Sequence, residues 1–444
     1  MNPFGDIKRV AFVSTRIAGT DGVSLEAGKW AEILERMGME CFYIAGECDR
    51  DASCSAVIDE ARFSHPAIES INRRAFGGEL RSPGLTDDIY DAARRIRNRL
   101  NQMLGDLRID GVIVENALTI PMNVPLGVAL VHSIMESGIG CLAHHHDFYW
   151  ERKRFLINAI DDIIHSAFPP PLPQIQHVVI NSLAGEEFSR RTGLSCRIIP
   201  NVMNFDQAPP EPDAYARSFR QEMGIAEGGW LILQPTRVVA RKGIEHSIEL
   251  VKRLQPDRAK LVITHSGGDE GEAYPSRVRE FAEMSGVDVI FARERIAQQR
   301  GTDPRGRKLF TMADAYSQAD LVSYPSEYEG FGNAFVEAIY YRQPVVCNRY
   351  AIYQSDIEPL GFRVVLFDGF LTQETVEEAR RVLSDRAYRR QLVEWNYELG
   401  RQFFNYGMVE DELRAMMNHP QNLYRVLSRR RPVSCPTGIG SADR

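Results

Sequence analysis

The sequence lacks the features that mark secreted, disulfide-rich or membrane-spanning proteins. Its seven cysteines are widely scattered and include no Cys-x-x-Cys pair, so we expect a reduced chain without a disulfide framework. No run approaches the roughly eighteen apolar residues that a membrane span requires. The first residues do not show the charged-then-apolar pattern of a signal peptide, and we therefore expect a cytoplasmic setting.

Two further absences narrow the range of ligands. The formal net charge of −7 argues against a protein that neutralises nucleic-acid phosphates, so no nucleic-acid partner is expected. The glycine-bearing loop from Arg16 to Ser24 lacks the Gly-x-Gly-x-x-Gly fingerprint, which weakens the case for a dinucleotide-dependent enzyme. Ser24 is expected to cap the helix that follows this loop.

The length and the apolar pattern predict two α/β domains. A chain of 444 residues exceeds the size at which one hydrophobic core keeps growing. Short apolar runs alternate with amphipathic stretches, so the expected fold is two tandem Rossmann-like, doubly wound domains with parallel sheets. Strands are expected at 9–15, 40–46, 111–116, 140–145, 177–181 and 196–200, and then at 231–236, 260–266, 287–292, 321–324 and 344–348.

A proline-rich stretch at 202–213, without either helical or strand periodicity, is expected to connect the two domains. This places the first domain at 1–202, the second at 203–404 and a frayed tail at 429–444. A polar, arginine-rich insertion at 293–308 is longer than a usual strand-to-helix loop. It is interpreted either as a solvated loop or as a loop that overhangs a ligand cleft.

The segment 324–348 joins a strand end, a glycine loop and a helix. Gly330 and Gly332 let the backbone approach a ligand, and the helix is expected to begin at about Asn333. The free N–H groups of Phe331, Gly332 and Asn333 would then favour an anionic phosphate at the helix N-terminus.

Two carboxylates in this segment, Glu329 and Glu337, stand eight positions apart. Because like charges repel, neither is expected to bind phosphate, and each should accept hydrogen bonds from neutral hydroxyl groups. A sugar ring and a ribose offer such hydroxyls. The segment therefore predicts a site for a nucleotide sugar.

Two cations precede another predicted helix. Arg237 follows the strand at 231–236, and Lys242 stands at the entrance of the helix. Cations at a helix N-terminus are unfavourable unless an anion lies between them, and a diphosphate would supply that anion. The alternative interpretation is two ordinary surface cations.

A polar cluster, His144, His145, His146 and Asp147, closes a strand of the first domain. Adjacent histidines on an extended strand point to opposite faces, so the three are not expected to share one metal ion, and no metal site is predicted. His146 is interpreted as a hydrogen-bond donor to substrate hydroxyls. Structural residues of a loop are the alternative.

Basic residues at two places bear on the partners. Arg152, Lys153 and Arg154, beside the histidines, indicate either an anionic acceptor or a solvated helix start. An arginine stripe on the helix at 87–104 could lie on an anionic membrane, although the outer face of such a helix is expected to be charged anyway. Peripheral membrane contact therefore stays open as an alternative.

Taken together, these residues resemble the retaining, nucleotide-sugar-dependent glycosyltransferases of family four, which have the GT-B fold of two Rossmann-like domains facing a central cleft. The resemblance rests mainly on the Glu-x7-Glu spacing of Glu329 and Glu337 and covers about residues 9–350. Weaker matches support it: Arg237 with Lys242-Gly243, Ile199-Pro200-Asn201 and His146-Asp147.

The resemblance implies that the first domain binds the acceptor and the second domain binds the nucleotide-sugar donor. It assigns catalytic roles at the diphosphate and the donor sugar to His146, Arg237, Lys242 and Glu329. The donor-binding residues that it implies are Gly22, Asp147, Gly330, Phe331, Gly332, Asn333 and Glu337, with Glu337 on the ribose. It also implies that a C-terminal helix at about 405–425 packs back on the first domain.

The implied reaction is transfer of a hexosyl group, with retention at the anomeric carbon, to a hydroxyl of a small, anionic or lipid-linked acceptor. Neither a metal nor a cofactor other than the donor is expected. The alternatives are a sugar-nucleotide epimerase, a phosphorylase of similar fold, and a non-catalytic nucleotide-sugar-binding protein.

Overall fold

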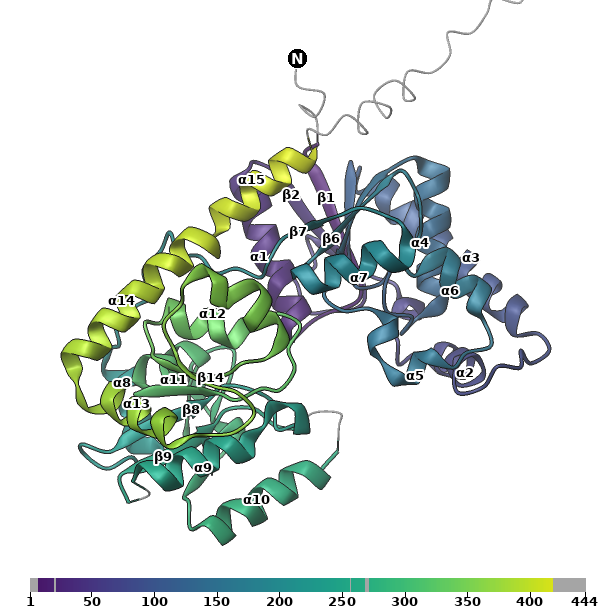
Figure 1. Cartoon of the computed structure of the whole chain (residues 1–444). Coiled ribbons are helices and arrows are strands. Elements are labelled where there is room, and N and C mark those ends of the chain that lie inside the picture. Colours follow the sequence, from purple (N-terminus) through teal and green to yellow (C-terminus); the bar gives the residue numbers. More distant parts are fainter. Residues whose placement is uncertain (1–6, 20, 256, 268–270, 418–444) are drawn as a thin grey trace, which may run out of the picture.

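Two parallel β-sheets of different strand order form the two halves of the molecule (Figure 1). The structure is a computed structural model that describes residues 7–19, 21–255, 257–267 and 271–417. The first sheet consists of β1 (Arg9–Ile17), β2 (Glu40–Cys48), β3 (Ser55–Val57), β4 (Gly111–Glu115), β5 (Gly140–His145), β6 (Ile175–Val179) and β7 (Cys196–Ile198). The second consists of β8 (Trp230–Gln234), β9 (Ala259–Ile263), β10 (Val289–Phe291), β13 (Leu321–Tyr324), β14 (Val345–Asn348) and β15 (Val365–Phe367).

Each sheet is doubly wound. The first has the order β3-β2-β1-β4-β5-β6-β7, and the second has the order β10-β9-β8-β13-β14-β15, with all neighbours parallel. The winding direction reverses between β1 and β4 and again between β8 and β13. In open α/β sheets, ligands bind outside the carboxyl ends of the strands at such a switch point. The predicted fold of two Rossmann-like domains is confirmed.

Helices cover both faces of each sheet (Figure 1). Those of the first half are α1 (Gly22–Arg36), α2 (Pro66–Ala75), α3 (Leu85–Asp106), α4 (Val124–Ser137), α5 (Lys153–Leu156), α6 (Asp161–Ala167) and α7 (Ser182–Thr192). Those of the second half are α8 (Ala214–Glu222), α9 (Ile244–Leu254), α10 (Ala273–Ser285), α11 (Met312–Gln318), α12 (Asn333–Tyr340) and α13 (Gln373–Ser384).

Apolar periodicity explains which helix faces are buried. On α3, Ile89, Ala93, Ile96 and Leu100 recur at spacings of three and four and are almost fully buried against the first sheet. The arginines on its outer face make surface ion pairs, such as Arg97 with Glu136. No helix in the described ranges is long and apolar enough to cross a membrane.

The last two helices run back from the second half to the first. They are α14 (Arg386–Phe403) and α15 (Tyr406–Met417), which form the yellow end of the described chain in Figure 1. α14 packs on α12, and α15 packs on α1. Tyr406 and Leu413 of α15 enter the core of the first half, and the Tyr406 hydroxyl donates a hydrogen bond to Glu32 of α1 at 3.1 Å. The predicted tail at 429–444 lies outside the described residues.

Three local expectations are corrected by the structure. The insertion at 293–308 is not a plain solvated loop, because it forms with Leu309 a two-stranded hairpin, β11 (Gly301–Thr302) and β12 (Lys308–Leu309), that is bonded to Tyr215 of α8. The two short edge strands β3 and β15 were not predicted. Asp21, rather than Ser24, caps α1, since its carboxylate accepts hydrogen bonds from the N–H groups of Val23 and Ser24.

Candidate active site

The carboxyl-terminal edges of the two sheets meet around the loop that precedes α12. The carbonyl oxygen of Gly330 accepts a hydrogen bond from Asn181 Nδ2 of the first half at 2.6 Å. A side chain at Gly330 would stand 3.4 Å from the carbonyl oxygen of His146, and one at Gly22 would stand 3.4 Å from Asn333 Nδ2. Gly22, His146, Gly330 and Asn333, predicted from three separate segments, therefore lie at one interface.

The backbone of this loop explains its glycines. Gly332 has a φ of 132°, a conformation that side chains rarely adopt, and a Cβ there would lie 2.5 Å from the Tyr350 hydroxyl. The predicted helix start at Asn333 is confirmed, and Asn333 Oδ1 accepts a hydrogen bond from Asn201 of the first half. The unpaired N–H groups at the start of α12 thus sit at the contact between the halves, where an anion would be favoured.

Glu329 and Lys242 are bonded to each other in the structure. The Lys242 ammonium donates to Glu329 Oε1, and Arg241 Nη1 lies 3.5 Å from the other carboxylate oxygen. Burial raises the pKa of Glu329, but the attraction of Lys242 outweighs it and holds that pKa below its usual range. Burial also lowers the pKa of Lys242. The expectation that Glu329 accepts only from neutral hydroxyls is therefore incomplete, because a cation holds it here.

Further cations converge on Lys242. Arg241 and Arg237 both act to lower its pKa, which places their charges near its ammonium group. His265, two residues after β9, is half-buried, and desolvation together with the charges of Arg293, Lys242 and Arg237 lowers its pKa to about 4. The loops after β8 and β10 thus concentrate positive charge around a neutral His265, which is the electrostatic setting that a diphosphate requires.

Glu337 lies in a different environment from Glu329. Its carboxylate accepts a hydrogen bond from the Tyr316 hydroxyl of α11 at 2.8 Å. Burial raises its pKa, and the charge of Lys29 of α1 acts in the opposite direction. The two carboxylates are therefore not bonded to each other, and Glu337 lies farther along α12, on the side of α1.

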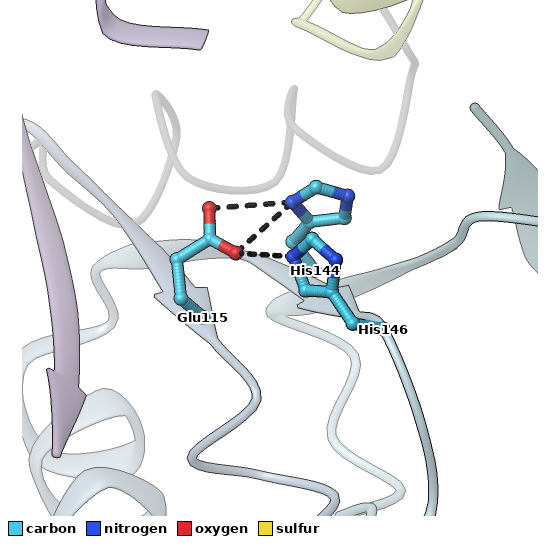
Figure 2. Close-up of side chains that lie close together, drawn as sticks. All are labelled: Glu115, His144 and His146. Atoms are coloured by element: carbon cyan, nitrogen blue, oxygen red, sulfur yellow. Dashed lines mark hydrogen bonds and ion pairs between the residues drawn. The ribbon is translucent and has the colours of Figure 1, made fainter. Parts of the chain in front are cut away.

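His146 belongs to a buried cluster that Figure 2 shows with Glu115 and His144. His146 Nε2 lies 3.0 Å from Glu115 Oε2, and His144 Nδ1 lies 3.1 Å from the same oxygen. His145 points to the opposite face, where it contacts His177 at 2.9 Å, as expected for alternating strand residues. Within the described ranges, Glu115, His144 and His146 have ligand-type atoms that lie close enough together to share a cation. Each of those atoms is already bonded to another member of the trio.

Asp147 holds its loop in place. Its carboxylate accepts hydrogen bonds from Asn116 Nδ2 at 3.0 Å and from Arg152 Nε at 2.7 Å. Asn116 Oδ1 in turn accepts from the backbone N–H of His146 at 2.7 Å. Arg152, one of the three predicted anion-binding cations, is therefore paired with a carboxylate of the protein. The other two, Lys153 and Arg154, are exposed and have no ion-pair partner among the described residues.

Sequence reasoning missed four residues that the structure adds to the interface. They are Glu115, Arg241, His265 and Asp356. A signal for Glu115 was present, since it is a single acidic residue at the end of an otherwise apolar strand. The other three follow from which loops meet, and no pattern in the sequence marks them.

Comparison with solved structures places the fold among glycosyltransferases. WaaG, a glycosyltransferase involved in lipopolysaccharide biosynthesis, aligns with a TM-score of 0.60 at 16% identity over 92% of this chain and 99% of that one. HepE from Anabaena, solved in complex with UDP-glucose, aligns with a TM-score of 0.60 at 13% identity over 95% of this chain and 99% of that one. The fold is that of the GT-B glycosyltransferases.

Sequence comparisons add the family. The model of the glycosyl transferases group 1 matches residues 306–399. The mannosylglucosylglycerate synthase of Thermotoga maritima is 32% identical over 438 residues, which cover 91% of this chain and 98% of that protein. The enzyme of the same name from Petrotoga mobilis is 33% identical over 80% of this chain and 86% of that protein. The chain belongs to the group 1 glycosyl transferases, the family four of the resemblance above.

Proposed function

We propose that the protein transfers a hexosyl group, with retention of the anomeric configuration, from a nucleotide-diphosphate sugar to a hydroxyl of a small anionic acceptor. The names of the two long relatives favour a mannosyl group as the group transferred and a glucosylglycerate as the acceptor. A glycerate carries one carboxylate, which agrees with the exposed cations Lys153 and Arg154 of the first half.

One observation carries the proposal. Where the two halves meet, a helix N-terminus and a cluster of cations suited to a diphosphate adjoin a buried carboxylate, Glu329, suited to sugar hydroxyls. A donor that occupies this point has its pyrophosphate at Lys242 and Arg237 and its sugar at Glu329 and His146. Its ribose reaches along α12 to Glu337.

In this arrangement the cations act on the leaving group. As the bond from the anomeric carbon to the diphosphate breaks, negative charge grows on the diphosphate oxygens next to Lys242 and Arg237, and stabilisation of charge that develops in the transition state accelerates the reaction. The departing diphosphate can take the acceptor's proton on the same face of the sugar, so the proposal needs no separate base. It also needs neither a metal nor a cofactor, because protein cations neutralise the diphosphate.

The test is a panel of nucleotide sugars with and without glucosylglycerate. We expect acceptor-dependent release of nucleotide with a mannosyl donor and an α-linked product by NMR. An epimerase would release no nucleotide, a phosphorylase would require inorganic phosphate, and a sensor would bind without turnover. Failure to bind any nucleotide sugar would reject the proposed site.

A further inference from the structure

A fully buried carboxylate, Glu115, lies directly behind the histidine that faces the second half. Glu115 and His144 are paired neighbours in the parallel β4–β5 ladder, and His146 follows two residues later on the same face. The side chain of Glu115 has no exposed surface, and that of His146 is 9% exposed. Burying an ionised carboxylate costs several kcal/mol unless it is paired, so the two imidazoles must supply its hydrogen bonds.

The two imidazoles have different roles in this cluster. His144 is stacked on the Trp30 indole with ring centroids 4.2 Å apart, and its Nε2 is buried without a hydrogen-bond partner among the described residues. Burial lowers its pKa, which describes a neutral ring whose Nδ1 proton points at Glu115. His144 is therefore packed as a core residue, and it has no route to a substrate.

His146 has the more exposed of the two rings, and its backbone carbonyl lies against Gly330 of the second half. Its Nε2 faces Glu115, so Nδ1 points away from the carboxylate, as Figure 2 shows. Burial acts to lower its pKa, but the hydrogen bond and the charge of Glu115 outweigh burial and raise that pKa above the usual 6.5, with Glu26 and Asp147 adding in the same direction. The charge of His146 in turn helps to lower the pKa of His144.

We propose that Glu115 is a positioning residue that fixes the ring of His146 through Nε2 and keeps it protonated, so that Nδ1–H donates a hydrogen bond to the donor sugar. The proposal rests on the proposed function. A neutral ring with its proton on Nε2 could only accept at Nδ1, whereas a protonated ring donates there.

The charge balance also favours this arrangement. The sugar becomes positively charged in the transition state, and an isolated imidazolium beside it would be repelled. Paired with Glu115, the cation belongs to a unit without net charge, since His144 is neutral. The ring can then donate its hydrogen bond at little electrostatic cost to the sugar cation.

The test compares Glu115→Gln with the wild-type protein. Glutamine keeps the shape and one acceptor oxygen but loses the charge. We expect the pKa of His146, followed by NMR and assigned with His146→Asn, to fall below 6.5. At a pH above that value, kcat should drop about tenfold to a hundredfold, the range for a hydrogen bond to a charged group, and it should recover as the pH is lowered.

Asp110→Asn provides the matched control. Asp110 immediately precedes β4, at the end of the strand opposite to Glu115. Its carboxylate accepts hydrogen bonds from the backbone N–H groups of Lys8 and Arg9. This variant removes a structural carboxylate and should leave both the His146 pKa and the pH profile of kcat unchanged.

Several results would overturn the proposal. One is a folded Glu115→Gln protein in which the His146 pKa or the pH profile of kcat is unchanged. Another is a stoichiometric metal ion that the wild-type protein binds and Glu115→Gln loses. If Glu115→Gln does not fold, the ¹⁵N shifts of wild-type His146 decide, because a neutral ring protonated on Nδ1 contradicts the bond to Glu115. Failure of the proposed function is distinct, since it removes turnover but leaves the ring titration intact.

Discussion

The ammonium group of Lys242 is already bonded to Glu329, so a diphosphate that reaches this loop must share or displace that contact. We expect Glu329→Gln to bind a free nucleoside diphosphate about threefold to tenfold more tightly, because the competing carboxylate charge is gone. Turnover of the nucleotide sugar should fall at the same time, since the sugar hydroxyls lose an ionised acceptor. Calorimetry and steady-state kinetics measure the two effects.

Glu327→Gln is the control for this prediction. Glu327 is two residues away and exposed, and it has no part in the Lys242 contact. It should change neither quantity. A parallel loss of nucleotide affinity and turnover in Glu329→Gln would show that the carboxylate supports the diphosphate site rather than competing with it.

Lys242→Ala should have the opposite effect on the nucleotide. We expect the affinity for a nucleoside diphosphate to fall at least about tenfold, because a buried cation beside the diphosphate is lost. The remaining affinity should depend less on salt concentration. Lys252→Ala removes the same charge from the exposed face of α9 and should bind normally. Equal effects of the two variants would indicate only general attraction by net charge.

Single residues also show where sequence reasoning succeeds and fails. The helix start at Asn333 was predicted correctly because the glycine loop and the helix lie within one short segment. Glu115 was missed because it meets His144 only through the pairing of β4 with β5, and the two are 29 positions apart. Ser24 was predicted as the cap of α1 instead of Asp21, because the two alternatives differ only in where the first helical turn begins.

At the scale of elements, the loop before α12 depends on the backbone conformation of Gly332. We expect Gly332→Ala to destabilise the second half by about 1–3 kcal/mol, through a positive φ and a close approach to the Tyr350 hydroxyl. Nucleotide binding should weaken with it, because the N–H groups of α12 move. Thermal melting with and without nucleotide measures both effects.

Gly301→Ala is the matched control. A Cβ at Gly301 would meet nothing within 4 Å, and its backbone φ lies outside the positive range. The melting temperature and nucleotide affinity of Gly301→Ala should match those of the wild type. If Gly332→Ala behaves in the same way, the loop can relax and its geometry does not depend on this glycine.

Elements were predictable where periodicity is long and local. The helix expected after Lys242 is α9, and the strand expected at 321–324 is β13. The three-residue strands β3 and β15 were missed, whereas β7 and β10, of the same length, were predicted because each lies within a longer apolar run at 196–200 and 287–292. The hairpin within 293–308 depends on Arg300, whose guanidinium bonds Asp213 and Asp314, and contacts between such distant positions leave no periodic trace.

At the scale of the whole molecule, a carboxylate of the second half docks on a helix of the first. Asp356, on a π-helical turn (Tyr353–Ile357), accepts a hydrogen bond from the backbone N–H of Ser182 at 2.6 Å. Ser182 begins α7, so the carboxylate lies at the positive end of a helix dipole. Further bonds cross between the halves, among them those from Asn181 to Gly330, from Asn201 to Asn333 and from Tyr328 to Glu151.

These contacts flank the loop that holds Glu329, so closure of the two halves and assembly of the site are coupled. We expect Asp356→Asn to weaken closure, because the amide loses the charge that interacts with α7. The radius of gyration from solution scattering should increase, and hydrolysis of the donor without acceptor should rise, since an open interface admits water. Asp368→Asn, which changes an exposed carboxylate of the same half, should alter neither. An unchanged radius of gyration and hydrolysis rate in Asp356→Asn would mean that this contact forms on closure but does not hold the halves together. The bonds made by Asn181 and Tyr328 would then be sufficient to keep the halves closed.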